Sequence, residues 1–465
     1  MRQVKIYLKY LEWNQNSMTT VIVLIFCTFY EIDLNYSAMT SRRKVIKSLG
    51  LAALSLPSLA GGATAWQLPQ MKFFPHSEDP AFWQGVRDQY MLSREQVFFN
   101  PGTVGAMPRV VVERVTRHMN YLATSVADWA YKDDNAERFI SGYQHLLFIR
   151  NKVAKLLNCD AKEIALTDNT TNAMSYIAQG MELKAGDEII TCNQEHSGGI
   201  SSWQVREKRD GAVVKIVELP KPIQNQEQVI ELITKAFTLK TKVLMLSHII
   251  TGSGAILPVK EICAEAKKRG IFTVLDGAQT TGHIKVDLRD LDCDSYVGCF
   301  HKWIGAPAGT GFMYVKSEHM KEIWTTIANG RWDNHEDEGF RFTQRGTGNF
   351  SLIEGLDAAL DFYFQIGPDR AYERIKFLGD RLREGLRSMS KVKIFSPADN
   401  AMCAGITVYN VEGMKGPQLQ DIFWERARMR PRSVGEVFGV RHCTHIFNSP
   451  EEIDKALGIV KQLAS

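Results

Sequence analysis

Two residues of opposite charge follow apolar runs that come one after the other near the middle of the chain. Asp276 comes directly after the run Ile271–Leu275, and Lys302 comes shortly after the run Ser295–Phe300. Short apolar runs of this kind are typical of strands buried in a parallel sheet. Ligands of open parallel sheets bind beyond the carboxyl ends of the strands. We therefore expect the carboxylate and the amine to face one ligand.

A third strand end carries groups that suit an anion. Thr170 and Thr171 lie in the run Asp168–Asn172, which follows the apolar run Glu163–Thr167 and opens a helix. Free backbone N–H groups at a helix start, together with two hydroxyls, form an anion site. A plain helix cap is the alternative, because Asn and Thr are both good N-caps. The two interpretations are compatible with each other.

In this order, the strand-end residues resemble the class V aminotransferase family of pyridoxal 5′-phosphate (PLP) enzymes, and within it the isopenicillin N epimerase-like proteins. The resemblance runs from about Phe98 to Asp454. It implies PLP as the cofactor and an α/β architecture of fold type I, with a mainly parallel sheet in the large domain and a smaller α+β domain. It also implies that the protein is an enzyme, either a transaminase or an epimerase.

The resemblance assigns roles to four residues around the PLP ring. Lys302 matches the lysine that forms a Schiff base with PLP, and its released amine would move the α-proton of the substrate. Asp276 would keep the ring nitrogen protonated, and Gln279 matches the residue that hydrogen-bonds the phenolic oxygen. His196 matches the aromatic side chain that stacks on the ring. Together these residues predict a PLP site.

Further positions match contacts beyond the ring. His301 and Thr347 match residues that bind the phosphate; the threonine usually comes from the neighbouring subunit, which implies a homodimer. Thr251 stands among the cofactor contacts, where many relatives have an Asn near the ring oxygen. Arg441 matches the arginine that binds the carboxylate of the substrate, a task suited to a forked guanidinium. Asn100 matches a loop residue on the substrate side.

Two departures from the desulfurase pattern bear on the reaction. Cys299 occupies the position of a phosphate-binding Ser, and the loop Arg430–Gly435 has no Cys where the longer-chain desulfurases carry their nucleophile. Arg430 and Arg432 in that loop either meet an acidic group of the substrate or are solvated loop charges. The alternatives to a transaminase or epimerase are a β- or γ-eliminating lyase, including a desulfurase, and a non-catalytic binding protein with this fold.

The histidines and cysteines do not indicate a metal site. His442 and His445 are three residues apart, but no carboxylate or Cys pair accompanies them at ligand spacing. Seven Cys follow residue 65, and their scatter indicates small hydrophobic residues inside the fold rather than a disulfide framework. We therefore expect no metal.

The elements that must position these residues alternate along the chain, which argues for a mainly parallel sheet covered on both faces. We expect residues 122–320 to form the PLP-binding large domain, residues 321–465 to form the small domain, and residues 66–121 to pack with the small domain. Strands are expected at 163–167, 188–192, 213–217, 242–247, 271–275, 295–300 and 404–409, and helices at 172–181, 227–237, 259–268, 351–365 and 369–389.

The charge of the chain is concentrated before residue 66. Lys and Arg number 56 against 52 Asp and Glu, and seven basic but only three acidic residues precede residue 66. The remainder is formally neutral, so nucleic acid is not an expected partner. Hydrophobic residues make up 45% of the chain and charged residues 23%, which is the balance of an ordinary folded protein.

The basic N-terminal region resembles a twin-arginine (Tat) export signal. Arg42 and Arg43 precede the apolar stretch Leu49–Ala60, and the small residues Ala63–Ala65 follow as a cleavage site. The apolar stretch is too short to span a membrane, which needs about 20 residues. The signal implies export by the Tat machinery to the periplasm.

We assign the signal to residues 39–65 and interpret residues 1–38 as an extension upstream of a true start at Met39. Tat carries folded proteins, typically with a cofactor already acquired, so the expected mature protein is a periplasmic PLP enzyme. By analogy with its relatives, the substrate is an amino acid or a peptide-linked amino acid. Transamination and epimerisation begin with the same deprotonation, so the residues leave both reactions open.

Overall fold

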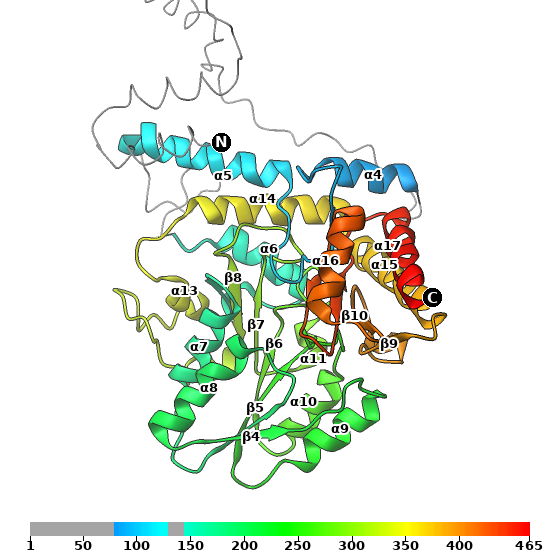
Figure 1. The fold of residues 1–465 in the computed structure, drawn as a ribbon. Helices are drawn as coiled ribbons and strands as arrows, with labels where there is room; N and C mark the ends of the chain where they lie inside the picture. Colours follow the sequence, from blue (N-terminus) through cyan, green and yellow to red (C-terminus); the bar gives the residue numbers. More distant parts are fainter. Residues whose placement is uncertain (1–78, 129–143) are drawn as a thin grey trace, which may run out of the picture. The chain divides into compact units, whose positions relative to one another are not determined.

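The centre of the protein is a seven-stranded sheet in a computed structural model that describes residues 79–128 and 144–465 (Figure 1). The strand order is β2-β8-β7-β6-β5-β3-β4, and β8 alone runs in the opposite direction to the other strands of this sheet. The prediction of a mainly parallel α/β sheet is confirmed. The strands are β2 (Ile164–Thr167), β3 (Glu188–Cys192), β4 (Val213–Val217), β5 (Thr241–Ser247), β6 (Phe272–Asp276), β7 (Ser295–Cys299) and β8 (Gly311–Val315).

Helices cover both faces of this sheet because its buried strands present apolar side chains on each side. In β5, Val243 and Met245 pack into one hydrophobic cluster, whereas Leu244 and Leu246 pack into another. The first cluster includes residues of α7 (Thr170–Gly180) and α8 (Ser197–Asp210). The second includes residues of α6 (Leu147–Leu157), α9 (Gln226–Lys235), α10 (Val259–Lys267) and α14 (Ser351–Ile366).

A smaller antiparallel sheet follows, in the order β12-β13-β10-β9. Its core includes Leu378, Leu382 and Leu386, which recur every four residues along α15 and so share one face of that helix. The strands are β9 (Val392–Ile394), β10 (Ile406–Val411), β12 (Arg432–Ser433) and β13 (Val440–Cys443), and the helices are α15 (Pro368–Arg387), α16 (Gly416–Ala427) and α17 (Pro450–Ala464).

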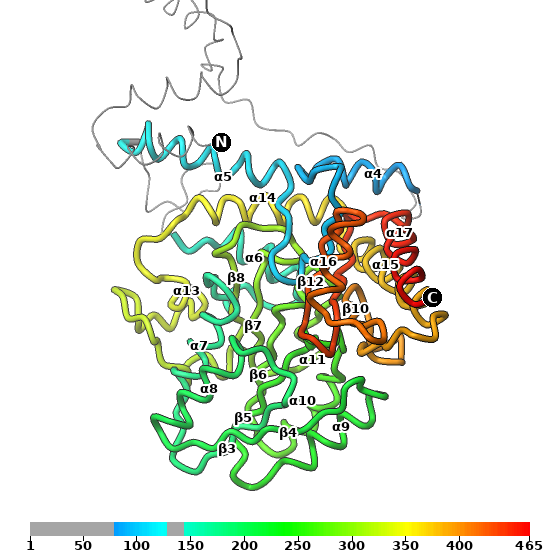
Figure 2. The backbone as a smooth tube through the Cα atoms, viewed as in Figure 1, coloured from blue at the N-terminus to red at the C-terminus, as the bar shows by residue number. Residues whose placement is uncertain are grey.

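The N-terminal part of the described chain joins both regions. Helix α5 (Arg109–Thr124) packs along α14, and strand β1 (Val97–Phe98) pairs in parallel with β11 (Met429–Arg430). Figure 2 shows this blue segment running down beside the orange strands near the C-terminus. The remaining helices are α4 (Pro80–Asp88), α11 (Leu288–Leu291), α12 (Ser317–Met320), α13 (Glu338–Thr343) and the 3-10 turns Val126–Asp128, Ala161–Glu163 and Asn400–Met402.

Several sequence-based expectations are not tested by this architecture. The described residues cluster as one compact unit, so the boundaries at 121 and 320 stay predictions. The proposed extension and Tat signal lie outside the described residues. Within residues 79–128 and 144–465, no helix is both long enough and apolar enough to cross a membrane.

Candidate active site

The strand-end residues meet in one cavity of about 550 Å³. Asn100 lies beside the cavity and contacts Arg441, whereas Thr347 lies exposed in the loop after α13 and is not part of the cavity lining. Nine of the eleven residues predicted for the site line the cavity: Thr170, Thr171, His196, Thr251, Asp276, Gln279, His301, Lys302 and Arg441.

Asp276 ends β6, and its buried carboxylate has few groups nearby that compensate its charge. Its side chain is 5% exposed, and within the described residues its only hydrogen bond comes from the Ala278 N–H at 2.8 Å. Burial raises the pKa of Asp276, while that hydrogen bond and the charges of Lys302 and His196 lower it in part. Gly199 leaves room beside the free oxygen, because a Cβ there would lie 2.9 Å from Oδ2. The carboxylate is therefore placed to pair with a cationic N–H of a ligand.

The turn that carries Lys302 is held from two sides. The Gly105 N–H donates to the His301 carbonyl at 2.7 Å, and a Cβ on Gly105 would lie only 1.8 Å from the Lys302 carbonyl oxygen. On the other side, His445 Nε2 lies 2.9 Å from the Trp303 carbonyl oxygen. Only glycine permits the close approach at position 105. The backbone of the lysine turn is thus fixed, and the amine can move only through its own side chain.

Unused donors gather where α7 begins. Asn169 caps the helix, since its side chain accepts from the Asn172 N–H at 2.9 Å. The Thr170 hydroxyl and His301 Nδ1 are buried, and neither has a hydrogen-bond partner in the described part of the chain. Burial lowers the pKa of His301, but the neighbouring Cys299 thiolate and the backbone of Thr310 together raise it above its usual value. A helix start, a hydroxyl and an imidazole together form a site for a phosphate.

Gln279 is more fully engaged than the sequence indicates. Its amide nitrogen donates to the Gly102 carbonyl at 2.9 Å and to the Thr251 hydroxyl at 3.1 Å, while its oxygen accepts from the Trp303 indole at 3.0 Å. Both amide hydrogens are therefore used. The predicted bond to a cofactor oxygen requires that one of these two bonds be exchanged.

Arg441 lies on β13 and is buried, with 2% of its surface exposed. Its guanidinium donates to the Thr251 hydroxyl at 2.6 Å, the Asn100 side-chain oxygen at 2.9 Å and the Thr103 hydroxyl at 3.1 Å. All three partners are neutral, and Nε has no partner among the described residues. A buried cation without a counter-ion is costly, so the site favours a carboxylate ligand. Sequence reasoning missed Thr103, whose only signal is its place in the loop of Asn100.

His196 and Cys299 complete the lining. His196 caps α8, and its Nδ1 accepts from the Gly198 N–H at 3.0 Å. Burial and the charge of Lys302 lower the pKa of His196, so its ring is neutral and suited to stacking. Although burial raises the pKa of Cys299, the nearby Lys302 and His301 lower it below its usual range. Its thiol donates to the Ala278 carbonyl at 3.6 Å.

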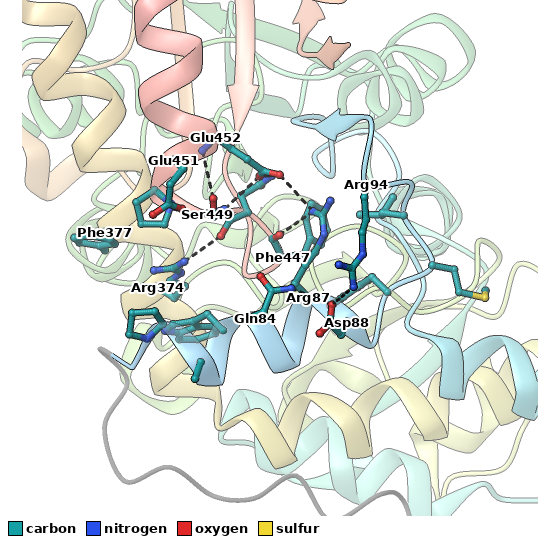
Figure 3. Close-up of a pocket in the computed structure, with 18 of the residues that line it drawn as sticks. Gln84, Arg87, Asp88, Arg94, Arg374, Phe377, Phe447, Ser449, Glu451 and Glu452 are labelled. Atoms are coloured by element: carbon teal, nitrogen blue, oxygen red, sulfur yellow. Dashed lines mark hydrogen bonds and ion pairs between the residues drawn. The ribbon is translucent and has the colours of Figure 1, made fainter. Parts of the chain in front are cut away.

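Two other features do not carry this chemistry. His442 packs among the rings of Phe99, Tyr409 and Phe423, and no group of three or more His, Cys, Asp or Glu in the described ranges can hold a metal. A second cavity of about 1180 Å³ lies between α4, α15 and the start of α17 (Figure 3). Arginines that line it bind neighbouring protein groups: Arg87 binds the Phe447 carbonyl and Glu452, and Arg94 binds Asp88.

The first cavity fits PLP on three counts. The poorly compensated charge of the buried Asp276 carboxylate matches a protonated ring nitrogen, and the unpartnered donors at α7 match a phosphate. Lys302 lies in the same cavity to bond the aldehyde. His196 adds a ring beside it. The fold and this site together define a PLP-dependent enzyme of fold type I.

Comparison with known proteins gives the family. The model of the class-V aminotransferases matches residues 97–452, so the chain belongs to that family. It is 28% identical to an isopenicillin N epimerase of Amycolatopsis lactamdurans, over 82% of this chain and 98% of that protein. It is 27% identical to a probable cysteine desulfurase of Xylella fastidiosa strain 9a5c, over 72% of this chain and 82% of that protein.

A solved structure shares the fold. It is a mutant of C-DES with glycine covalently linked to its PLP cofactor, and it superposes with a TM-score of 0.71 at 25% identity. The alignment covers 81% of this chain and 99% of that one. The resemblance stated from the sequence is thereby confirmed at the level of family, fold and cofactor.

Proposed function

We propose that this protein is a periplasmic PLP-dependent enzyme of the aminotransferase or epimerase type, which acts on the amino group of an amino acid or of a peptide-linked amino acid. One observation carries the proposal: Lys302, Asp276 and the buried Arg441 line a single cavity. An amine, a carboxylate and a carboxylate-binding guanidinium are the groups that such a reaction needs. The relationship to isopenicillin N epimerases supports it.

Each residue has a defined task in this proposal. PLP, when bound, withdraws electrons from the α-carbon of the substrate and makes its proton acidic. Arg441 holds the carboxylate next to that carbon, and Lys302 takes up the proton and returns it. Asp276 keeps its charge opposite the ring nitrogen. The site that receives the returning proton decides between transamination and epimerisation.

A PLP-dependent lyase or desulfurase is the second candidate, because relatives named as desulfurases and a C–S lyase share the fold. The loop that would carry a desulfurase nucleophile speaks against it. Ser433 and Val434 of that loop line the cavity, and the loop contains no Cys. A serine hydroxyl is a far weaker nucleophile than a thiolate at neutral pH.

Export and assembly complete the proposal. Arg42 and Arg43 support export by the Tat machinery to the periplasm. A homodimer is supported by three large apolar side chains that lie exposed close together in sequence: Trp324 (60%), Ile327 (42%) and Trp332 (48%). Thr347, exposed and away from the cavity of its own chain, would serve the cavity of the partner.

The proposal is tested by absorbance. The purified protein should show a visible band from bound PLP, and amino acids or amine-bearing peptides that bind should shift it. Lys302→Ala should lose the band in its original form while the circular dichroism spectrum stays unchanged. A 2-oxo acid product would identify transamination, and a changed optical rotation with no change in molecular mass would identify epimerisation. An unchanged band in the variant, or no response to any amine, would overturn the proposal.

A further inference from the structure

Strands β12 and β13 place two arginines side by side. Arg432 and Arg441 are partners in the antiparallel register, and residues directly opposite each other lie on the same face of a sheet. Both guanidiniums bind one oxygen, the hydroxyl of Thr103, at 2.9 Å from Arg432 Nη1 and 3.1 Å from Arg441 Nη2. The two nitrogens are therefore at most 6.0 Å apart, the sum of these distances.

This pair has no counter-ion within the chain segments that the structure describes. Like charges directly opposite each other destabilise a sheet. The hydrogen-bond partners of both side chains are Thr103, Asn100 and Thr251, all of them neutral. The only carboxylate that lines the cavity is Asp276, which the ring nitrogen of PLP requires. Two cations that face one cavity are thus left for the substrate.

The neighbouring Arg430 shows that this arrangement is particular to position 432. Its guanidinium lies 4.2 Å from the centre of the Trp424 ring, and it does not line the cavity. Arg432, two residues later, is exposed and is part of the cavity lining. The structure therefore distinguishes two arginines that the sequence left equivalent: Arg430 packs on an aromatic ring, and Arg432 lines the cavity.

We propose that the cavity selects amino substrates that carry a second acidic group, such as a dicarboxylic amino acid, free or peptide-linked. The buried Arg441 binds the carboxylate next to the reacting carbon, and the exposed Arg432 binds the second carboxylate. This inference deepens the proposed function, and it rests on that proposal for the claim that the substrate carries a reacting amino group. The binding of two acidic groups needs no amine chemistry and can be measured separately.

Calorimetry of the PLP-loaded enzyme with glutarate and pentanoate tests the inference. The two acids have the same five-carbon chain and differ by one carboxylate, and neither carries an amine. Glutarate should bind at least about tenfold more tightly, because a charge-assisted hydrogen bond contributes roughly 1.5–3 kcal/mol. Arg432→Gln should remove this preference and leave pentanoate binding unchanged. Arg432→Lys, which keeps the charge and loses the fork, should retain part of it.

Arg430→Gln is the matched control and should bind both acids as the wild type does. Equal affinities for the two acids in the wild type would overturn the inference. It would also be overturned if Arg432→Gln weakened both acids equally, since both arginines would then hold the same carboxylate. Should glutarate bind as expected while no amino acid shifts the PLP band, the proposed function fails and this inference stands. If L-alanine and L-glutamate shift the PLP band equally and glutarate binds no more tightly than pentanoate, the proposed function stands and this inference fails.

Discussion

Glu195 is a half-buried acid at the edge of the site, and the proposed chemistry leaves it unused. It follows β3 and accepts hydrogen bonds from the Ser247 N–H at 2.9 Å and the Ser247 hydroxyl at 2.5 Å. Burial raises the pKa of Glu195 to about 7, partly offset by these bonds. In the unfolded chain the same group titrates near 4.5. Its protonation is therefore coupled to folding.

We predict that Glu195→Gln flattens the pH dependence of stability. The raised pKa means that Glu195 favours the folded state below pH 4.5 and loses this contribution as the pH rises through 7. Glutamine keeps an acceptor for Ser247 and does not titrate. Between pH 5 and pH 8 the wild type should lose about 2.5 kcal/mol of unfolding free energy relative to the variant. Urea unfolding of both proteins at the two pH values measures this, and parallel curves would contradict it.

At the scale of elements, the strand β13 fixes the thiol of Cys443 close to Arg441, the arginine proposed to bind the substrate. Cys443 lies two residues after Arg441, is fully buried, and donates its backbone N–H to the Phe99 carbonyl at 2.9 Å. It pairs with Ile406 of β10 and does not line the cavity. A thiol inside a paired strand cannot swing to a substrate sulfur as a loop cysteine does.

The protein is therefore expected not to release sulfide from cysteine at an enzymatic rate, and Cys443→Ala should behave like the wild type. Sulfide would be measured with PLP-loaded protein, with a known cysteine desulfurase as the positive control. Rapid sulfide release by the wild type that disappears in Cys443→Ala would contradict this prediction and would favour desulfuration as the reaction of this site.

Local patterns explain why some elements were predicted well. The expected strands at 188–192 and 213–217 coincide with β3, which is buried, and with β4, an exposed to half-buried edge strand, because both are short runs rich in β-branched residues. β8 was not predicted, and neither was the pairing of β1 with β11, which joins residues such as Val97 and Met429. Pairings over such separations depend on tertiary contacts that a local pattern does not record.

The same distinction holds for the site. Residues at strand ends were predicted because topology brings them together, and nine of eleven line the cavity. The network that joins Gln279, Thr251 and Arg441, the role of Thr103 and the difference between Arg430 and Arg432 depend on side-chain directions. Those directions follow from the register of β12 and β13. Thr347 remains a prediction that requires a second chain.

At the scale of the whole molecule, export is the property that the sequence alone predicts. Replacing Arg42 and Arg43 by Lys keeps the charge and removes the guanidinium geometry. We expect the double variant to accumulate in the cytoplasm, as measured by fractionation and immunoblotting. Lys44 and Lys47 replaced by Arg is the control and should be exported normally. Periplasmic levels of the double variant equal to those of the wild type would contradict a Tat signal.

The bond between Asn100 and Arg441 has a consequence for how each copy is made. The two residues are 341 positions apart, and the cavity that they border also needs the sheet in between. A ribosome that adds about 5–20 residues per second takes roughly 20–70 s to travel from one to the other. Lys302 is made 139 positions before Arg441, so for roughly the last 7–28 s of that interval the chain carries the amine but not the arginine that we propose binds the substrate carboxylate. Every nascent chain therefore passes through a stage at which it carries the Lys302 amine but does not yet carry the arginines proposed to select the substrate.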